Sequence, residues 1–177
     1  MKKFIVFLLL PLLVACGANK KVVEVAPSKS ILIPNSCRES KALSAVQSEI
    51  PGADFIDTKW TPAPNTELAD VLNNGGIACS FGISSAEIGA TIKWVKDDKK
   101  NFEKWVPNWL TDGYQKVDLT SYGLSNGYFL QKAQSATQEF NVWILNFKAG
   151  GVWVSIGRTS GTSISDGAKL IEAVISQ

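Results

Sequence analysis

Apolar and polar residues alternate in several stretches of the chain, as they do in strands that bury one face. Over residues 87–95 every second side chain is apolar, and the side chains between them are mostly polar or small. This period of two predicts a half-buried strand. A second strand is predicted over 77–83, joined to the first by a turn at Ser84 and Ser85. The alternating apolar positions are Ile88, Ala90, Ile92 and Trp94.

The last third of the chain is rich in predicted strands, which cover 114–119, 127–133, 139–147 and a returning strand from Val152. Residues 139–147 are apolar on both faces, which predicts a central strand covered on both sides. A tight turn is predicted at Ala149-Gly150-Gly151. The two apolar sets are Phe140, Val142 and Ile144 on one face and Trp143, Leu145 and Phe147 on the other.

Apolar residues at helical spacing predict helices before and after these strands. The first helix begins at a capping box of Ser36 and Glu39, in which each side chain satisfies a free backbone N–H, and it stops at Pro51. The last helix follows a cap at Ser163 or Ser165 and carries an apolar stripe toward the core.

A middle helix is predicted after Asp97 or Asp98, either of which can cap it. Pro107 should kink or break this helix, because proline lacks the backbone N–H and clashes with the preceding turn. A short helix is an option over 66–72, within an otherwise loop-like region.

The order of elements is helix, two strands, helix, about four strands and helix. Alternating strand–helix units are missing, so we predict an α+β fold with a single twisted antiparallel sheet of about five to six strands and about three helices packed on it. One domain covers 35–177, and 16–34 form a tether. The apolar residues Ile31–Ile33 predict an edge strand that Pro34 ends.

Residues 1–15 have the composition of an export signal peptide. Lys2 and Lys3 precede an apolar run over 4–14 that is too short to span a membrane. The run leads into Leu13-Val14-Ala15-Cys16, which resembles the lipobox of bacterial lipoproteins. The resemblance implies cleavage before Cys16, acylation of its sulfur and residence at the extracytoplasmic face of the cell membrane. An ordinary secretory signal with an incidental cysteine is the alternative.

Charge and composition exclude several classes of function. The chain has 177 residues, with 18 Lys or Arg, 16 Asp or Glu and no His. Without histidine there is no Ser-His-Asp or Cys-His catalysis and no His-ligated metal site. Cleavage before Cys16 removes two lysines and leaves 16 positive and 16 negative side chains. This balance gives no long-range pull toward nucleic acid, so we expect no nucleic-acid partner.

Cys37 and Cys79 remain once Cys16 is assigned to the lipid. An even pair of cysteines in an exported domain is most simply a disulfide. Two free thiols are the alternative, whereas a redox pair is disfavoured because the chain has no Cys-x-x-Cys spacing.

Three features of the domain point to a family: Cys37 at the start of a helix, Gly76-Ile77-Ala78-Cys79 in a strand, and Gly151-Val152-Trp153-Val154 before the last helix. With these features the domain resembles small actinobacterial surface lipoproteins built on a two-cysteine domain, which are similar to the extracytoplasmic sensor domains of some bacterial Ser/Thr kinases. The Cys-x-Trp found in many of them is replaced here by Cys79-Ser80-Phe81. The resemblance supports the disulfide and implies no activity.

Candidate catalytic groups are few. Gly123–Gly127 matches the Gly-x-Ser-x-Gly of a nucleophile elbow, but that motif needs a histidine and a following helix. Paired carboxylates at Asp54 and Asp57 are the remaining route to hydrolysis of a glycan. Asp97 and Asp98 are better explained as helix caps. No phosphate-binding loop or calcium motif is present, and we expect no metal and no cofactor.

Six tryptophans are many for this length. Trp94 and Trp143 stand in apolar strand patterns and are predicted to be core residues. Trp60, Trp105 and Trp109 are the candidate ligand-binding residues, because exposed indole rings bind sugars and partner proteins. We expect a non-enzymatic envelope module that contacts an envelope protein, a cell-wall glycan or a small apolar ligand. The alternative is an envelope hydrolase.

Overall fold

The computed structural model describes residues 29–132 and 141–177, which form one seven-stranded antiparallel sheet with strand order β1-β2-β3-β7-β6-β5-β4. The strands are β1 (Asp54–Ile56), β2 (Ile77–Ile83), β3 (Ile88–Lys96), β4 (Gln115–Asp118), β5 (Asn126–Lys132), β6 (Val142–Ala149) and β7 (Val152–Arg158). The α-helices are α1 (Lys41–Glu49), α2 (Glu67–Asn73), α3 (Asn101–Thr111) and α4 (Ala168–Ile175). Short 3-10 turns cover Cys37–Glu39, Ser84–Ala86, Thr120–Tyr122 and Ser165–Gly167.

This architecture confirms the predicted α+β fold with a single antiparallel sheet. The sheet has seven strands where five to six were expected. One strand that was not predicted is β1, whose three residues lie in a region with too few alternating positions to give a pattern. The short helix that was an option over 66–72 is α2.

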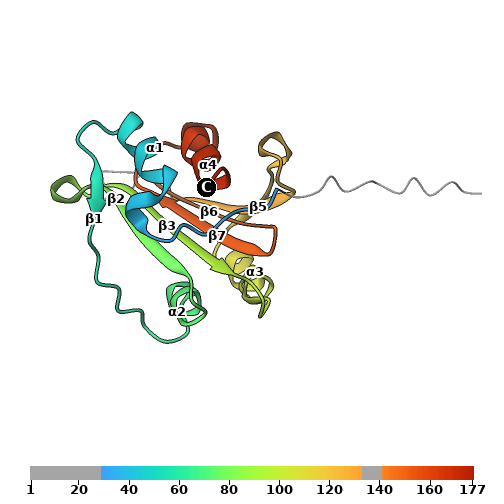
Figure 1. Ribbon diagram of the computed structural model, residues 1–177. Helices are drawn as coiled ribbons and strands as arrows, with labels where there is room; N and C mark the ends of the chain where they lie inside the picture. The colour runs from blue at the N-terminus through green and yellow to red at the C-terminus, as the bar shows by residue number, and fades with distance from the viewer. Residues whose placement is uncertain (1–28, 133–140) are drawn as a thin grey trace, which may run out of the picture.

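Helices lie on both faces of the sheet (Figure 1). We call the face under α1 and α4 the covered face. Its side chains are almost entirely apolar, and Trp94 and Trp143 are fully buried there, as predicted. Trp143 is central to this packing, and its indole N–H donates to the Ser160 carbonyl at 3.0 Å. The other large residues of this core are Phe81, Ile92, Leu145, Phe147, Val154, Ile156, Leu170 and Ile171.

The predicted capping box at the start of the first helix is wrong. Ser36 precedes a 3-10 turn and makes no side-chain cap. The α-helix starts later and is capped by Ser40, whose hydroxyl accepts from the Ala42 N–H at 3.2 Å. The same hydroxyl accepts from the Gln177 side chain at 3.1 Å, so this cap also holds the chain's C-terminus.

The predicted edge strand over Ile31–Ile33 is also wrong, because these residues pair with no strand. They form an extended segment in which Ile31 is buried in the covered-face core while Leu32 is 65% exposed. The segment therefore attaches to the domain through a side chain rather than through backbone hydrogen bonds.

The middle helix runs unbroken through Pro107, so of the expected kink or break the break is wrong. Pro107 is exposed, so the carbonyl that it leaves without a helical donor can be hydrated. Of the two predicted caps, Asp97 is confirmed: its carboxylate accepts from the N–H groups of Asn101 at 2.6 Å and Phe102 at 3.2 Å. At the last helix, Ser163 contacts the 3-10 turn instead, accepting weakly from the Asp166 N–H at 3.4 Å.

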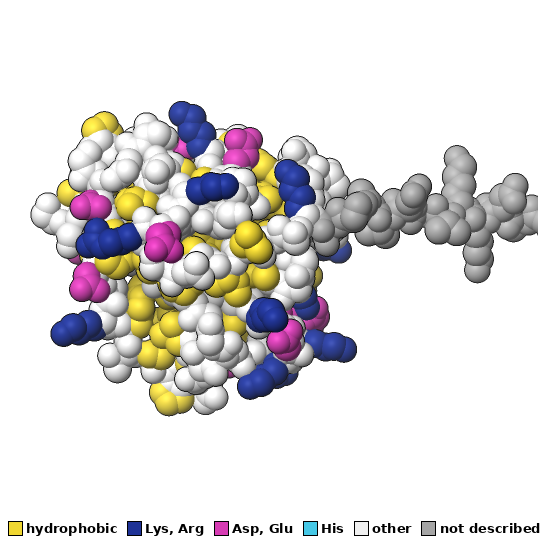
Figure 2. All heavy atoms as spheres, viewed as in Figure 1, with side chains coloured by type: hydrophobic (Ala, Val, Ile, Leu, Met, Phe, Trp, Pro, Cys, Tyr) yellow, Lys and Arg dark blue, Asp and Glu magenta, His cyan; other side chains and the backbone are white. Residues whose placement is uncertain are grey.

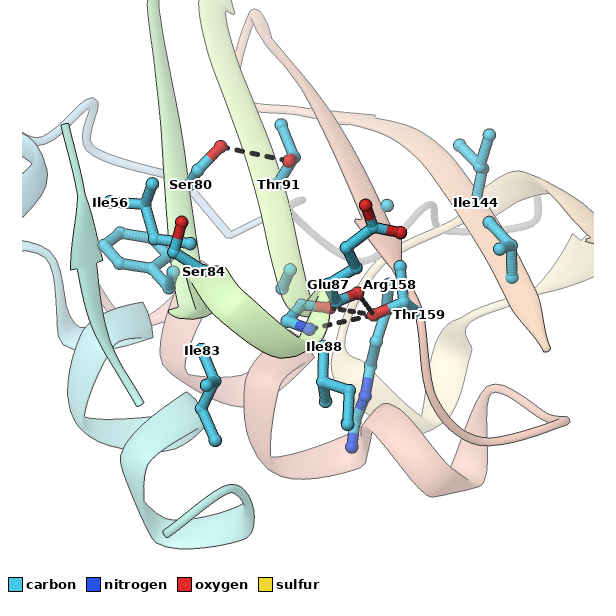
Figure 3. A pocket seen from close by; sticks show the side chains of 15 residues that line it. Ile56, Ser80, Ile83, Ser84, Glu87, Ile88, Thr91, Ile144, Arg158 and Thr159 are labelled. Atoms are coloured by element: carbon cyan, nitrogen blue, oxygen red, sulfur yellow. Dashed lines mark hydrogen bonds between the residues drawn. The ribbon is translucent and has the colours of Figure 1, made fainter. Parts of the chain in front are cut away.

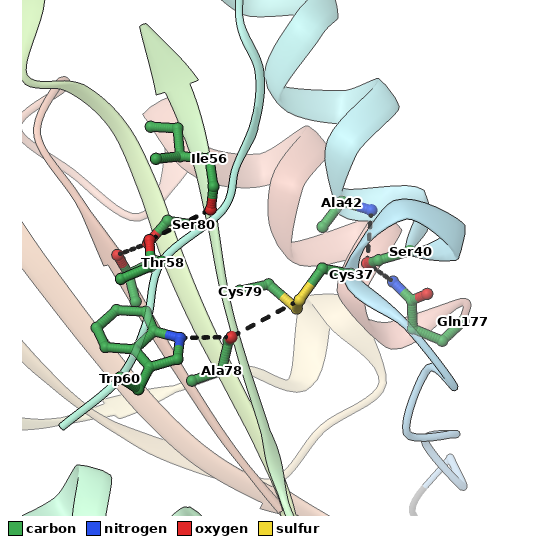
Figure 4. The surroundings of a disulfide bond; sticks show 11 residues. Cys37, Ser40, Ala42, Ile56, Thr58, Trp60, Ala78, Cys79, Ser80 and Gln177 are labelled. Atoms are coloured by element: carbon green, nitrogen blue, oxygen red, sulfur yellow. Dashed lines mark hydrogen bonds between the residues drawn. A yellow bond between two sulfur atoms is a disulfide. The ribbon is translucent and has the colours of Figure 1, made fainter. Parts of the chain in front are cut away.

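Cys37 and Cys79 form the predicted disulfide, with their Cα atoms 5.4 Å apart (Figure 4). The bond joins the 3-10 turn before α1 to the middle of β2, across 42 residues of sequence. It therefore fixes where the first helix sits on the covered face.

Removing this cross-link should strongly destabilise the domain. For a closed loop of 42 residues, the lost loop-closure entropy predicts that Cys37→Ala/Cys79→Ala lowers the free energy of unfolding by about 4 kcal/mol. Urea unfolding followed by tryptophan fluorescence measures this change. Treating the wild type with a reductant should reproduce it, and equal stability of the oxidised and reduced proteins would contradict it.

Candidate functional site

The face of the sheet opposite α1 and α4 is covered over only part of its area, and we call it the split face. Here α2 and α3 pack on Val95 and Trp153. Trp109 lies at the centre of this second core, with its ring centroid 5.1 Å from that of Phe102 and 5.8 Å from that of Trp153. Toward the β2–β3 turn, no helix in the described part of the chain covers the split face (Figure 1).

Two of the three predicted ligand-binding tryptophans lie together, at the contact between α2 and α3. Trp109 is only 1% exposed, and its indole N–H donates to the Glu67 carboxylate at 2.5 Å. Trp105 is half-buried and donates to the Asp70 carboxylate at 2.7 Å. Glu67 also pairs with Lys93 at 2.8 Å, which ties α2 to β3. Burial raises the pKa of the Tyr114 hydroxyl beside this contact, and the negative charge of Glu67 acts in the same direction.

The third predicted tryptophan, Trp60, lies apart from the other two. It is half-buried at the edge of the sheet, where its indole N–H donates to the Ala78 carbonyl at 2.9 Å (Figure 4). Cys37 Sγ lies 3.6 Å from the same oxygen, but this contact is not a hydrogen bond, because a sulfur in a disulfide carries no proton. Trp60 thus occupies the edge of β2 beyond the end of the short strand β1.

The paired carboxylates Asp54 and Asp57 are both exposed. Asp54 accepts from the neighbouring Phe55 N–H at 2.7 Å, and neither carboxylate lines any of the three hollows described below. The Ser125 of the Gly-x-Ser-x-Gly match lies in the turn before β5, and a strand follows it where an elbow requires a helix. These groups therefore do not meet around a cleft.

A buried charge on the split face has a structural role. The Asp97 side chain is fully buried and pairs with Lys148 at 2.7 Å, and Lys148 also pairs with Glu103 at 2.8 Å. Partial burial acts to raise the pKa of Glu103, but the hydrogen bond and charge of Lys148 outweigh it and lower the pKa. The same contacts raise the pKa of Lys148. This network joins the start of α3 to β6.

The uncovered part of the split face holds an open depression of about 340 Å³ (Figure 3). One row of paired residues crosses it on five neighbouring strands, namely Ile56, Ser80, Thr91, Gly157 and Ile144. The small residues stand in the middle of the row and the isoleucines at its two ends, so the row is low at its centre. A further apolar side chain comes from Val142, whereas the side chains of Ile83 and Ile88 point to the opposite side of the sheet (Figure 3).

Gly157 at the middle of this row has room for a side chain. An added Cβ would meet only the Thr91 carbonyl, at 3.8 Å, and the backbone of Gly157 does not have a positive φ. Gly89, which lies in β3 like Thr91, has no such room, because an added Cβ would lie 2.1 Å from the Phe81 carbonyl. Close packing therefore explains Gly89 and does not explain Gly157. A glycine inside a strand is unfavourable unless something approaches the backbone closely.

Glu87 forms the rim of the depression at the β2–β3 turn. Its backbone is left-handed, with φ of 54°, a conformation that favours glycine or asparagine. The Thr159 hydroxyl holds this turn: it accepts from the Gly89 N–H at 2.8 Å and donates to the Glu87 carbonyl at 3.0 Å. The Glu87 carboxylate extends over the strands, between Thr91 and Ile144 in the view of Figure 3.

The lining of the depression is mainly aliphatic, with a few polar groups. Its walls are aliphatic, and its polar groups include the Ser80 and Thr91 hydroxyls, whose oxygens are 3.3 Å apart, and the single carboxylate of Glu87. Phe81 borders it only through the backbone, because its side chain is buried in the covered-face core. Among the residues that the structure describes, none gives the depression an aromatic ring on which a sugar could stack.

Two other hollows have a different character. One, of about 480 Å³, lies beside Lys29, Tyr122 and Glu172, where the described chain begins. The other, of about 290 Å³, has the Tyr128 ring beside Lys116 and further polar groups. A glycan would find an aromatic ring in these hollows and not in the depression.

Neither a metal centre nor a membrane span is found in the residues that the structure describes. In 29–132 and 141–177, no group of three or more carboxylates, cysteines or histidines is placed to bind a metal ion. None of the helices in the same ranges is long and apolar enough to cross a bilayer.

Replacing Gly157 tests whether its small size serves the fold. Gly157→Ala should raise the free energy of unfolding by about 0.5–1 kcal/mol, because alanine loses less backbone entropy and the space above it is free. Gly89→Ala is the matched control and should lower stability by about 1–3 kcal/mol through its backbone clash. Urea denaturation of both variants gives these values. A clear loss of stability in Gly157→Ala would show that the fold itself needs this glycine.

A scan against protein-family models found no match for this chain, and searches of curated proteins and of solved structures also found no similar protein. The site is therefore defined by its own geometry, as a glycine-floored aliphatic depression with one carboxylate at its rim.

Proposed function

We propose that the chain is an exported lipoprotein whose domain is a non-enzymatic binding module of the cell envelope. In this proposal residues 1–15 are removed, acyl chains on Cys16 hold the protein in the membrane, and 35–177 lie on the extracytoplasmic side. The depression on the split face is the binding site, and its open floor at Gly157 is the observation that carries the proposal.

Several features support the location. The short apolar run after Lys2 and Lys3 and the lipobox-like residues before Cys16 are the sequence features of a lipidated export signal. The disulfide of the domain suits an oxidising compartment outside the cytosol. Positive and negative side chains are interspersed on the face shown in Figure 2, and the chain after residue 15 has 16 of each, so the proposal assigns attachment to the acyl chains.

The position of the depression relative to the tether also supports a binding role. The described chain begins beside the β6–β7 turn, where the Lys29 carbonyl and Ser30 lie within 3.4 Å of the position a Cβ on Gly150 would take. The depression lies at the opposite end of β7, a strand of seven residues that spans about 20 Å. A domain anchored through Cys16 would thus hold its binding site on the side away from the tether.

The depression favours a small ligand with an apolar part over the other expected partners. Its volume is at the lower end of the range for small-molecule sites, about 300–1,000 Å³. No observation favours the hydrolase alternative, because Asp54 and Asp57 lie outside the depression.

The anchor is tested by replacing its acceptor. Cys16→Ser should move the protein from the membrane fraction to the soluble extracytoplasmic fraction or leave an uncleaved precursor, because no sulfur can take the lipid. Cell fractionation and mass spectrometry of the amino terminus measure both effects. Asn19→Ser, in the tether, is the control and should stay lipidated in the membrane. An unmodified, non-acylated amino terminus in the wild type would refute the anchor.

A further inference from the structure

We propose that the depression on the split face selects a small organic cation: a molecule with a compact aliphatic body and one ammonium group. This inference rests on the proposed binding function and adds the ligand's charge and shape. The aliphatic body lies over Gly157 between the isoleucines, and the ammonium group pairs with Glu87.

The apolar part of the site defines the body of the ligand. The side chains of Ile56 and Ile144 stand on the split face at the two ends of the row, and each is half-buried, so a ligand would complete the burial of surfaces that are already partly dehydrated. Ile83 and Ile88 border the depression, but their side chains point to the opposite side of the sheet (Figure 3). The free space above Gly157 lets the ligand reach the sheet backbone at the lowest point of the row. Because the floor is short, a branched body of few carbon atoms fits it better than a long chain.

The charge of the site defines the head group. Among the described residues, no cation pairs with the Glu87 carboxylate. Arg158 is the only basic residue in the described lining of the depression, and its side chain points away from Glu87 (Figure 3). Its guanidinium is held by the Glu49 carboxylate at 2.5 Å and by the Asp166 carbonyl at 3.0 Å. A carboxylate without a partner, beside aliphatic walls, is complementary to an alkylammonium ion.

The remaining polar groups suit an ammonium ion better than an anion. An ammonium group has three N–H donors and no acceptor. The hydroxyl oxygens of Ser80 and Thr91 in the floor can accept from such donors alongside the Glu87 carboxylate. An anionic ligand would instead meet Glu87 as a like charge, with no free basic side chain lining the depression to offset it.

The two isoleucines make the site directly observable. Methyl NMR of isoleucine-labelled, lipidated protein in detergent micelles can follow Ile56 and Ile144 against Ile171 and Ile175, which belong to α4 and are buried in the covered-face core. The probes are 3-methylbutylammonium, its neutral analogue 3-methylbutan-1-ol and its anionic analogue 3-methylbutanoate. The amine should shift the methyls of Ile56 and Ile144 with a dissociation constant of about 1–10 mM, as expected for six non-hydrogen atoms. The alcohol should bind several-fold more weakly, and the anion should produce no site-specific shifts.

Two variants separate the charge from the shape of the site. Glu87→Gln should weaken amine binding about three- to fivefold, the effect of an exposed ion pair, and leave the alcohol unchanged. Gly157→Val should abolish binding of both probes by filling the floor, while the covered-face methyl spectrum and the thermal unfolding show an intact fold. Valine suits a strand backbone, so this variant is expected to fold.

The outcomes distinguish this inference from the proposed function. If amine and alcohol bind equally at Ile56 and Ile144, or if Glu87→Gln changes nothing, cation selectivity is refuted while the depression stands as a binding site. If no probe shifts these methyls specifically, the inference is refuted together with the assignment of the depression, whereas the anchoring at Cys16 is decided independently by fractionation.

Discussion

The pairing of β3 with β7 is the constraint on which the domain depends, because it joins strands β1–β3 to strands β4–β7 in one sheet. Its register places Thr91 opposite Gly157 and Trp94 opposite Val154. A slip by one residue would turn the apolar side chains of one strand from the covered face to the split face. The same register aligns the row that forms the depression, so the core and the site are fixed by a single set of backbone hydrogen bonds.

The two faces of this sheet are built for different purposes. The covered face buries large apolar side chains under α1 and α4 and is stapled by the disulfide. On the split face, α2 and α3 cover a smaller, largely aromatic core, and carboxylates of α2 also accept from the indoles of Trp105 and Trp109. Because most of the burial lies on the covered face, part of the split face can stay open without loss of the fold.

The sequence predicted the elements that repeat locally and missed those that depend on distant partners. Alternation over 87–95 and the cysteine pair were sufficient to predict β3 and the disulfide, which the structure confirms. The burial of Trp109 could not be predicted, because the acceptor of its indole N–H is Glu67. This residue lies 42 positions away in the sequence, a separation that no local pattern reveals. The residues of the depression come from five strands, and only the register brings them together. Gly157 was the one available signal, a glycine inside an otherwise well-formed strand.

At two positions beside the depression, the residue type is not the one that the local backbone favours. Gly157 is a glycine where a side chain would fit, and Glu87 is a charged side chain in a left-handed conformation that suits glycine. A left-handed residue alone is weak evidence, since Lys100 adopts the same conformation at the start of α3. What distinguishes Glu87 and Gly157 is that both line the same depression. The open space above Gly157 lies beside the carboxylate of Glu87, which pairs with no cation among the described residues. Each choice is unfavourable for the isolated fold, and the cation with an aliphatic body that we propose as the ligand would give both residues a role.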